Sequence, residues 1–259
     1  MINFFFEKIG SALLHFFEVI GGLVVLMFQT FKWIFRKPLE KENIFAQMNR
    51  IGVESLPVLL LITTFIGMVL ALQTAIVVEA KIKGFSRFIG ATVSIAMTRE
   101  LGPVISAFVM AGRIGSAIAA EIGTMKVTEQ LDAMETMATS PVKYLVVPRF
   151  LSGIFMLPLL ALLGDLVGIL GGLFISVAIL KTSAVIYLDN VQMYLKMNDI
   201  FNGLLKTVVF GAIISLVGCY KGFQTTGGAE GVGRAATESV VLSFVLVVVM
   251  DYILTSMLF

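Results

Sequence analysis

The sequence predicts an all-α integral membrane protein with about five transmembrane helices, an N-terminal amphipathic helix in the membrane interface and a short cytoplasmic helix. Of its 259 residues, 58% are hydrophobic and only 14% are charged, whereas soluble domains carry about 25% charged residues. Five apolar stretches are long enough to cross a bilayer, which takes about 20 residues. No stretch of soluble-domain composition is long enough to fold separately. We therefore expect a single membrane domain.

The first 36 residues carry a narrow polar stripe on an otherwise apolar helix. Its members follow one another at steps of three and four, with one step of seven: Lys8, Ser11, His15, Glu18, Gly22, Gln29, Lys32 and Arg36. Such a helix can lie in the membrane interface with its broad apolar face among the acyl chains. The competing interpretation is a spanning helix whose stripe faces the other helices. Trp33 and the basic run at 36–41 would hold either helix at the headgroups.

The five expected spans follow in order along the chain. The first is 57–78, the second lies within 88–120, the third is 150–180, the fourth is 203–220 and the fifth is 239–259. Glycines recur in the first four of these stretches. Small residues let helix backbones approach closely in a membrane, so these four spans are expected to pack tightly.

Basic residues in the loops predict the orientation. With five spans, one side collects nine Lys and Arg residues: Arg36, Lys37, Lys41, Arg50, Lys126, Lys143, Arg149, Lys221 and Arg234. The other side collects five: Lys81, Lys83, Arg87, Lys181 and Lys196. Cytoplasmic loops are enriched in Lys and Arg, so the first set is expected in the cytoplasm. The N-terminus is then cytoplasmic and the C-terminus lies outside.

A charged and hydroxylated segment separates the second and third spans. Its pattern predicts an amphipathic helix at 124–140, which Pro141 ends. The apolar stripe consists of Val127, Leu131, Met134 and Ala138, and the acidic residues on the other faces are Glu129, Asp132 and Glu135. The helix could cap the bundle, or it could seat in a groove of a soluble partner. The pattern alone leaves both interpretations open.

Three stretches closely resemble the signature of MlaE-type permeases, the membrane subunits of ABC transporters that handle phospholipids with MCE-domain partners. They are 98–149, beginning TRELGPVISAFVMAGRIGSAIAAEIGTMKVTEQL, IGMVLALQ at 66–73 and GAEGVGRAATESVV at 228–241. The resemblance covers most of residues 50–259, the expected permease domain. Residues 1–49 match only in character, as the family's interfacial helix followed by a basic linker. The resemblance implies that 124–140 is the coupling helix that contacts the ATPase.

The resemblance also implies partners and a location. The partners are an ABC ATPase subunit that holds ATP and Mg, an MCE-domain lipid-binding protein, a second copy in a homodimer and a phospholipid substrate. The implied location is the bacterial inner membrane, with the C-terminus in the periplasm and a role in outer-membrane lipid asymmetry. A net charge of +2 is too small to imply binding to nucleic acid.

The residues agree with a non-catalytic subunit that has no cofactor or metal of its own. The chain has no GxxxxGK[ST] phosphate loop, and GGAEGVGR at 227–234 lacks the P-loop lysine. We expect that glycine-rich run to be a cytoplasmic turn. The sequence also has no Cys/His cluster with metal-binding spacing and no credible set of nucleophile and base. ATP hydrolysis is therefore expected on another chain.

Four ionisable residues fall at middle to outer depth in the expected spans: Arg99, Glu100, Lys206 and Asp251. Intramembrane charges usually face a polar interior or a transport pathway. Arg99 and Glu100 point in different directions from their helix, so each is expected to pair with another helix. Two roles remain open. The cluster could only fix the bundle, or it could also form part of a lipid-headgroup pathway in which a cation attracts the phosphate.

A row of apolar residues on the first span is the candidate wall of a lipid cavity. Phe65, Met68, Leu72 and Ile76 recur at helical spacing. In a dimer these residues are expected to contact phospholipid tails, with the last span as the opposite wall. Ordinary packing of the bundle explains the same spacing.

Two classes of function are consistent with these observations. The first is the permease of an ABC transporter that moves phospholipids between the inner membrane and an MCE-type partner. The second is an ion- or proton-coupled carrier that uses Glu100, Asp165 and Asp251 as a relay. Copurification of an ATPase, and lipid transfer that persists without an ion gradient, would distinguish the first from the second.

Overall fold

The computed structural model describes residues 2–36, 40–79 and 88–259, and it is helical throughout with short connections. Side chains are described from residue 17 onward and at residues 10 and 14, apart from the gaps and residue 79. Several residues used above lie outside this described part: the side chains of Lys8, Ser11 and His15, and all of Lys37, Lys81, Lys83 and Arg87.

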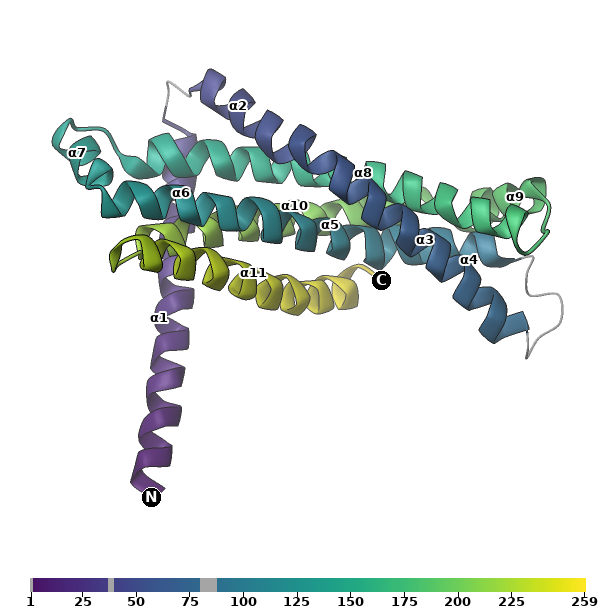
Figure 1. Cartoon of the computed structure of the whole chain (residues 1–259), viewed down its shortest axis with the longest axis horizontal. Coiled ribbons are helices and arrows are strands. Elements are labelled where there is room, and N and C mark those ends of the chain that lie inside the picture. The colour runs from purple at the N-terminus through teal and green to yellow at the C-terminus, as the bar shows by residue number, and fades with distance from the viewer. Residues whose placement is uncertain (1, 37–39, 80–87) are drawn as a thin grey trace.

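Six helical segments within the described residues are long and apolar enough to cross a membrane. They are Phe17–Ile34, Lys41–Val78, Ile89–Val127, Val142–Ala178, Met197–Phe223 and Gly228–Leu258. The last five coincide with the five predicted spans, of which 150–180 and 239–259 end two residues and one residue beyond the observed segment, and they form an elongated bundle (Figure 1). The first lies in the N-terminal stretch for which the sequence left two interpretations.

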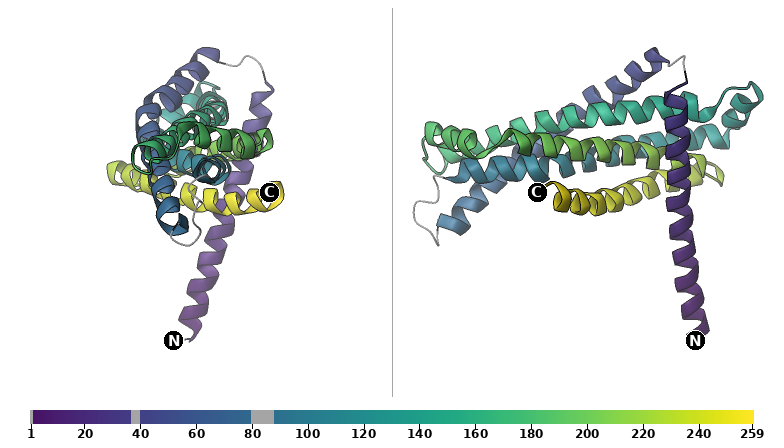
Figure 2. Two further views of the ribbon diagram at one scale, coloured as in Figure 1. Left: turned by 90° about the vertical axis from the view of Figure 1, so that its right-hand side faces the viewer. Right: turned by 180° about the vertical axis from the view of Figure 1, so that it is seen from behind.

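Helix α1 (Ile2–Ile34) runs across the bundle rather than along it, and its N-terminal part extends away from the other helices (Figures 1 and 2). Its C-terminal half packs against α8 and α10. Val19, Leu26 and Thr30 are buried there, whereas Gln29 and Lys32 of the polar stripe are exposed. Gln29 and Lys32 therefore face away from the bundle, contrary to the alternative of a stripe that faces the other helices. Gly22 of the same stripe does lie against the bundle, where an added Cβ atom would be 2.5 Å from the Tyr220 ring.

The first bundle segment is one long helix with a short irregularity. Helix α2 (Lys41–Gly52) continues through the 3₁₀ turn η1 (Val53–Ser55) into α3 (Leu56–Glu79). Helix α2 packs against α8, where the Ser152 hydroxyl donates a hydrogen bond to the backbone carbonyl of Ile44. Helix α3 contains the predicted first span and also packs chiefly against α8.

The second bundle segment is a single helix with two π-helical interruptions. Its parts are α4 (Ile89–Ala96), η3 (Met97–Leu101), α5 (Gly102–Met110), η4 (Ala111–Gly115) and α6 (Ser116–Val127). A short helix, α7 (Gln130–Thr136), then leads to the third segment.

The remaining segments complete the bundle. The π-helical turn η5 (Val142–Val146) opens α8 (Val147–Ala178), and the short α9 (Ala184–Tyr194) follows at the end of the bundle opposite α7 (Figure 1). Helix α10 (Met197–Phe223) returns toward the α7 end. Helix α11 (Gly228–Leu258) then runs back along the bundle.

Close backbone contact holds α3 against α8. A Cβ atom added at Gly67 would collide with the backbone carbonyl of Gly168, and one added at Gly171 would lie 2.6 Å from the carbonyl oxygen of Thr64. The predicted role of glycine in tight packing is confirmed at these positions. Small residues at such contacts allow dispersion attraction over a long interface, which is a main source of helix association within a membrane.

Each of the three π-helical turns accepts an interhelical hydrogen bond at a backbone carbonyl. The Lys206 ammonium donates to Arg99 O at 3.0 Å, the Ser239 hydroxyl to Gly115 O at 3.2 Å, and the Asn43 amide to Tyr144 O at 3.1 Å. Single π turns inside α-helices are frequent at functional sites. In this bundle each of them also carries a polar contact between helices.

Candidate functional site

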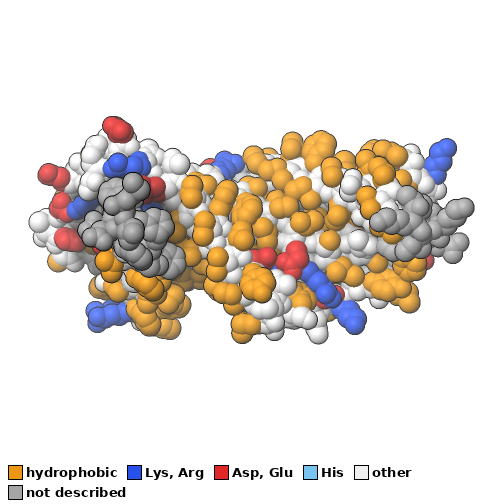
Figure 3. All heavy atoms as spheres, turned by 90° about the horizontal axis from the view of Figure 1, so that it is seen from below, with side chains coloured by type: hydrophobic (Ala, Val, Ile, Leu, Met, Phe, Trp, Pro, Cys, Tyr) orange, Lys and Arg blue, Asp and Glu red, His pale blue; other side chains and the backbone are white. Residues whose placement is uncertain are grey.

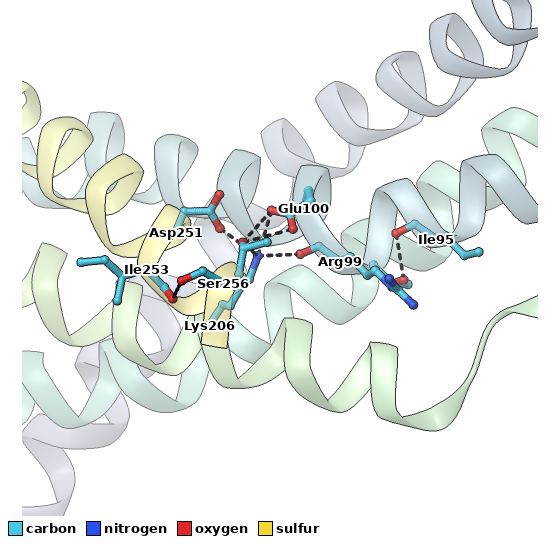
Figure 4. A network of polar contacts seen from close by, with 9 residues as sticks. Ile95, Arg99, Glu100, Lys206, Asp251, Ile253 and Ser256 are labelled. Atoms are coloured by element: carbon cyan, nitrogen blue, oxygen red, sulfur yellow. Dashed lines mark hydrogen bonds and ion pairs between the residues drawn. The ribbon is translucent and has the colours of Figure 1, made fainter. Parts of the chain in front are cut away.

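The candidate site is a group of charged side chains where η3, α10 and α11 meet (Figure 4). Arg99 and Glu100 lie on the π-helical turn η3, Lys206 on α10, and Asp251 on α11. Lys206 follows the start of α10 by nine residues, which corresponds to about 14 Å along the helix axis. The group therefore lies well inside the apolar length of the bundle, on the side of α9.

Lys206 is at the centre of the group and is fully buried. Its ammonium lies 2.8 Å from Glu100 Oε2 and 3.0 Å from Asp251 Oδ1. It also lies 2.6 Å from the Thr255 hydroxyl and 3.0 Å from the backbone carbonyl of Arg99. Four acceptors surround a group with three N–H donors. The charge of Lys206 is thus used within the protein, and its ammonium has no free side.

Arg99 has a different partner. Its Nη2 lies 2.8 Å from Oδ1 of Asp199, a buried residue in the first turn of α10. The other carboxylate oxygen of Asp199 accepts a hydrogen bond from the backbone N–H of Lys196 at 3.1 Å. The Arg99 guanidinium lies 4.7 Å from the ring centre of Phe259, which is within the range of a cation–π contact. Both neighbours hold the guanidinium in one place.

The four predicted charged residues differ in the exposed fraction of their side chains. The Arg99 and Glu100 side chains expose 36% and 39% of their surface, Asp251 exposes 20% and Lys206 none. Figure 3 shows acidic and basic side chains together in the middle of a largely hydrophobic face. Arg99 is therefore the cation of this group that can meet an external anion.

The structure brings all four predicted residues into one neighbourhood, joined by η3, and Arg99 and Glu100 each pair with a residue on another helix, as expected. Lys206 bridges both Glu100 and Asp251, whereas Arg99 pairs with Asp199, which the sequence reasoning missed. Asp199 precedes the predicted span 203–220, so it was not counted among the intramembrane charges. The available signal was an acidic residue in the first turn of a helix, a position favoured by the helix dipole.

The candidate cavity row lies along α3 and is only partly open. Phe65 and Ile76 are exposed, and Met68 and Leu72 pack in part against a core of residues from α3, α4, α8 and α9. The chief packing partners of α11 are α6 and α10, whereas α3 packs against α8. In one chain α11 is thus not the main neighbour of α3, and the expected opposite wall requires a second copy.

The predicted helix at 124–140 is interrupted. Val127 ends α6, Glu129 has a left-handed backbone with φ of 60°, and α7 covers only Gln130–Thr136. A second left-handed residue, Ala138 with φ of 57°, follows before Pro141. Pro141 therefore stands at the start of the next helical turn and does not end the predicted one. A left-handed turn at a non-glycine residue is uncommon, so periodicity alone could not place it.

The orientation of α7 also differs from the expected partner-facing stripe. Leu131 is buried in the main hydrophobic core, and Met134 is partly buried against it. Val127, Glu129, Asp132 and Glu135 are exposed, and Lys126 pairs with Asp132 at 3.2 Å. Leu131 and Met134 of the apolar stripe thus pack on the chain's own bundle, whereas Val127 and Ala138 remain exposed beside the acidic residues.

Asp165 stands apart from the charge group. This buried α8 residue packs against Gly102 of α5, and no hydrogen bond or ion pair to it is recorded within the described residues. Glu100 and Asp251 instead share Lys206. The three carboxylates proposed for a relay are therefore not joined in one hydrogen-bonded chain.

Comparisons with known proteins identify the family. The family described as Permease MlaE matches residues 44–257. A probable ABC transporter permease protein of Rickettsia typhi is 42% identical over 97% of this chain and 96% of its own length. The chloroplastic protein TRIGALACTOSYLDIACYLGLYCEROL 1 of Arabidopsis thaliana is 40% identical over 93% of this chain and 67% of its own length. The intermembrane phospholipid transport system permease protein MlaE of Haemophilus influenzae is 34% identical over 100% of this chain and 99% of its own length. The chain belongs to the MlaE permease family and is the non-catalytic membrane subunit of an ABC transporter.

Proposed function

We propose that this permease moves phospholipid between the bacterial inner membrane and an MCE-domain partner, driven by a separate ATPase subunit that binds ATP and Mg. The Haemophilus influenzae relative is an intermembrane phospholipid transport system permease protein, and this chain is similar to it over nearly its whole length. That similarity supports phospholipid as the substrate. The observation that carries the proposal is the partly open Arg99 guanidinium, which leaves η3 of the second apolar segment and pairs with Asp199 in the first turn of α10. An intramembrane charge exposed in this way usually marks a substrate path.

The geometry assigns different roles to the two cations. Lys206 is enclosed by acceptors from η3 and α11, so it holds these elements to α10. Arg99 is kept in place by Asp199, yet a third of its side chain is open. A guanidinium presents paired N–H donors that match the geometry of phosphate oxygens. In this proposal Arg99 contacts the headgroup phosphate, and the acyl chains lie along apolar helix faces nearby.

A homodimer would complete the lipid path. The exposed Phe65 and Ile76 of α3 need an apolar neighbour if they line a cavity, and α11 carries its own exposed apolar residues, such as Val241, Val245 and Val248. Within a single chain α11 packs chiefly against α6 and α10, not against α3. A second copy would supply that wall, as the proposed dimer requires.

The same proposal places the α7 end of the bundle in the cytoplasm. Leu26 of α1 and Leu131 of α7 line one cavity of about 330 Å³, so the two helices lie at the same end. Since α1 runs across the bundle, it would lie along the membrane surface if the bundle crosses the bilayer. Residues 1–49 would then form the interfacial helix and linker, 50–259 the permease domain, and the C-terminus would face the periplasm.

The ATPase would dock on the exposed side of α7. Glu129, Asp132 and Glu135 give this surface a negative charge, and electrostatic complementarity predicts basic residues on the partner. Leu131 and Met134 would transmit movement of α7 to the bundle, because both pack against its core. In this proposal residues 124–140 act as the coupling segment even though only seven of them form α7.

A reconstituted transporter tests the role of Arg99. The permease, its ATPase and its MCE partner are placed in vesicles, and ATP-driven transfer of labelled phospholipid is measured for Arg99→Gln combined with Asp199→Asn. Removing both partners leaves no unpaired buried charge, so thermal stability should stay close to wild type, whereas transfer should fall at least about tenfold. The control is Arg113→Gln with Glu54→Gln, an ion pair outside the group whose arginine has similar exposure. Normal transfer by a stable Arg99 and Asp199 double variant would refute the pathway role.

The secondary-carrier alternative makes a distinct prediction in the same vesicles. Family membership favours transfer powered by ATP, and Asp165 is not connected to the other two carboxylates. Transfer should therefore continue after ionophores have abolished all ion gradients. A dependence on an ion gradient without a dependence on ATP would support the carrier instead.

A further inference from the structure

A cavity of about 610 Å³ lies between α2, α6 and the start of α8, at the α7 end of the bundle. Its volume falls in the range of small-molecule sites, roughly 300–1,000 Å³. Polar side chains supply much of its lining: Asn43, Gln47, Arg50, Glu121, Tyr144 and Arg149. None of these residues belongs to the charge group at Lys206. The cavity is therefore separate from the proposed lipid path.

The cavity carries an excess of positive charge. Glu121 is shared by two arginines, with Oε1 contacting Arg50 and Oε2 lying 2.9 Å from Nη2 of Arg149. One carboxylate thus faces two guanidinium groups, which leaves a formal charge of +1. Arg50 has no other recorded partner in the described part of the chain, and its side chain is 39% exposed. Arg50 therefore has N–H donors available to a bound anion.

Arg149 adds a second, nearly buried cation to the lining of the cavity. Its side chain is only 6% exposed. The Arg149 guanidinium also interacts with the buried Cys219 thiol of α10, so its contribution to the cavity is its positive charge rather than free N–H donors.

The surroundings place the cavity at the boundary between membrane and water. Tyr144 lines it, and the neighbouring Lys143 ammonium lies 5.9 Å from the ring centre of Trp33. Arg36 lies 5.2 Å from the same ring. Trp, Tyr and basic residues gather at the depth of lipid headgroups. Arg50 would therefore lie at the depth of the lipid headgroups, where a headgroup of the adjacent leaflet can contact it.

We propose that this cavity binds the phosphate-bearing headgroup of an anionic phospholipid, as a second lipid site distinct from the transport path. The phosphate would accept hydrogen bonds from Arg50, and the charge of Arg149 would add to the attraction. Asn43, Gln47 and Tyr144 would contact the remaining polar atoms of the headgroup. Because the site joins α2 to α6 and α8, an occupied cavity would tie the long first segment to the coupling end of the bundle.

The sole tryptophan of the chain provides a probe close to the cavity. The full-length permease in mild detergent is titrated with phosphatidylglycerol whose acyl chains carry bromine, and quenching of Trp33 fluorescence is recorded. Brominated phosphatidylcholine with the same chains serves as the zwitterionic comparison. The proposal predicts saturable quenching at a concentration of phosphatidylglycerol roughly tenfold below that needed for phosphatidylcholine.

Two variants give opposite expected shifts. Arg50→Gln removes the open cation but leaves the pair of Arg149 and Glu121, so the preference for phosphatidylglycerol should fall about tenfold. Glu121→Gln removes the competing carboxylate and should raise that preference several-fold. Arg113→Gln is the matched control, since Arg113 is as exposed as Arg50 but lies outside the cavity. The control should behave as wild type.

Three results would overturn the proposal. Equal quenching by the two lipids would show that the site does not select an anionic headgroup. Equal affinities for Arg50→Gln and Arg113→Gln would show that the cavity is not the site. Displacement of brominated phosphatidylglycerol by millimolar inorganic phosphate, as effective as displacement by unlabelled phosphatidylglycerol, would identify a soluble phosphate as the ligand. None of these measurements depends on transport, so failure here would leave the proposed function of the permease intact.

Discussion

The ammonium of Lys206 donates a hydrogen bond to the backbone carbonyl of Arg99, 3.0 Å away, while the Arg99 side chain turns to Asp199. The side chain of Lys206 is therefore hydrogen-bonded to the backbone of Arg99, whereas the two charged groups have different partners. Lys206 is a buried cation that joins η3, α10 and α11. Arg99 is a partly exposed cation whose only carboxylate partner among the described residues is Asp199.

Replacing Lys206 with Met should destabilise the permease strongly. The substitution keeps the length of the side chain but leaves Glu100 and Asp251 close together without a cation. Removing one member of a buried ion pair costs about 3–5 kcal/mol. Thermal unfolding in detergent would measure the loss. The triple variant that adds Glu100→Gln and Asp251→Asn should recover most of it, and a triple variant as unstable as the single one would contradict the assigned pairing.

Gly67→Ala should separate α3 from α8. The added methyl group would meet the backbone carbonyl of Gly168, which cannot move aside as a side chain can. Overpacking of this kind typically costs about 1–3 kcal/mol. Gly233→Ala on α11 is the control, because a Cβ atom there meets nothing within 4 Å. It should be neutral or stabilise slightly. Equal unfolding temperatures for the two variants would show that the close contact contributes little.

Much of the fold follows from the sequence because apolar length and composition set the spans. Each of the five predicted spans coincides with one observed helical segment to within two residues at its C-terminal end or lies inside it, and the charges in these spans predict Glu100, Lys206 and Asp251 as neighbours. The pairing of Arg99 with Asp199 could not be predicted from the spans, because Asp199 lies in the first turn of α10, before the predicted span. Spacing within one helix does not determine which helix stands opposite.

The coupling segment shows where periodicity fails. The stripe from Val127 to Ala138 predicted one helix, but the left-handed backbone at Glu129 divides it. Such a turn is decided by tertiary packing, here the burial of Leu131 in the bundle core. The π-helical turns could not be predicted either, since these segments are apolar on most sides and have no polar stripe whose displacement would reveal an added residue.

Charge reversal on the exposed side of α7 should detach the ATPase. Asp132→Lys combined with Glu135→Lys places two positive charges where basic partner residues are expected, and both positions are exposed. Recovery of the ATPase with the tagged permease should fall at least about tenfold, with little change in unfolding temperature because exposed ion pairs contribute only about 0–1 kcal/mol. Glu42→Lys, an exposed acid on α2, is the control. Undiminished recovery with the double reversal would place the ATPase contact elsewhere.

Leu131→Asp should have a different effect. Leu131 is 4% exposed and belongs to the main core, so the new carboxylate would be buried without a partner and cost several kcal/mol. The permease itself should lose thermal stability, and the loss should appear without the ATPase present. A variant with wild-type stability that still failed to hold the ATPase would show that Leu131 faces the partner in the assembled transporter.

Photocrosslinking at Phe65 tests most directly the proposal that phospholipid passes along α3. A photoreactive residue is placed at Phe65, which is 59% exposed, or at Phe155 or Phe174 on α8, each 60% exposed. The assembled transporter is irradiated in membranes with and without ATP, and covalently captured phospholipid is quantified by mass spectrometry. The account predicts several-fold more capture at Phe65 than at the two equally exposed α8 positions, and a change in that capture when ATP is added. Equal capture at all three positions, unaffected by ATP, would mean that Phe65 meets only the surrounding bilayer and would contradict the proposed lipid path.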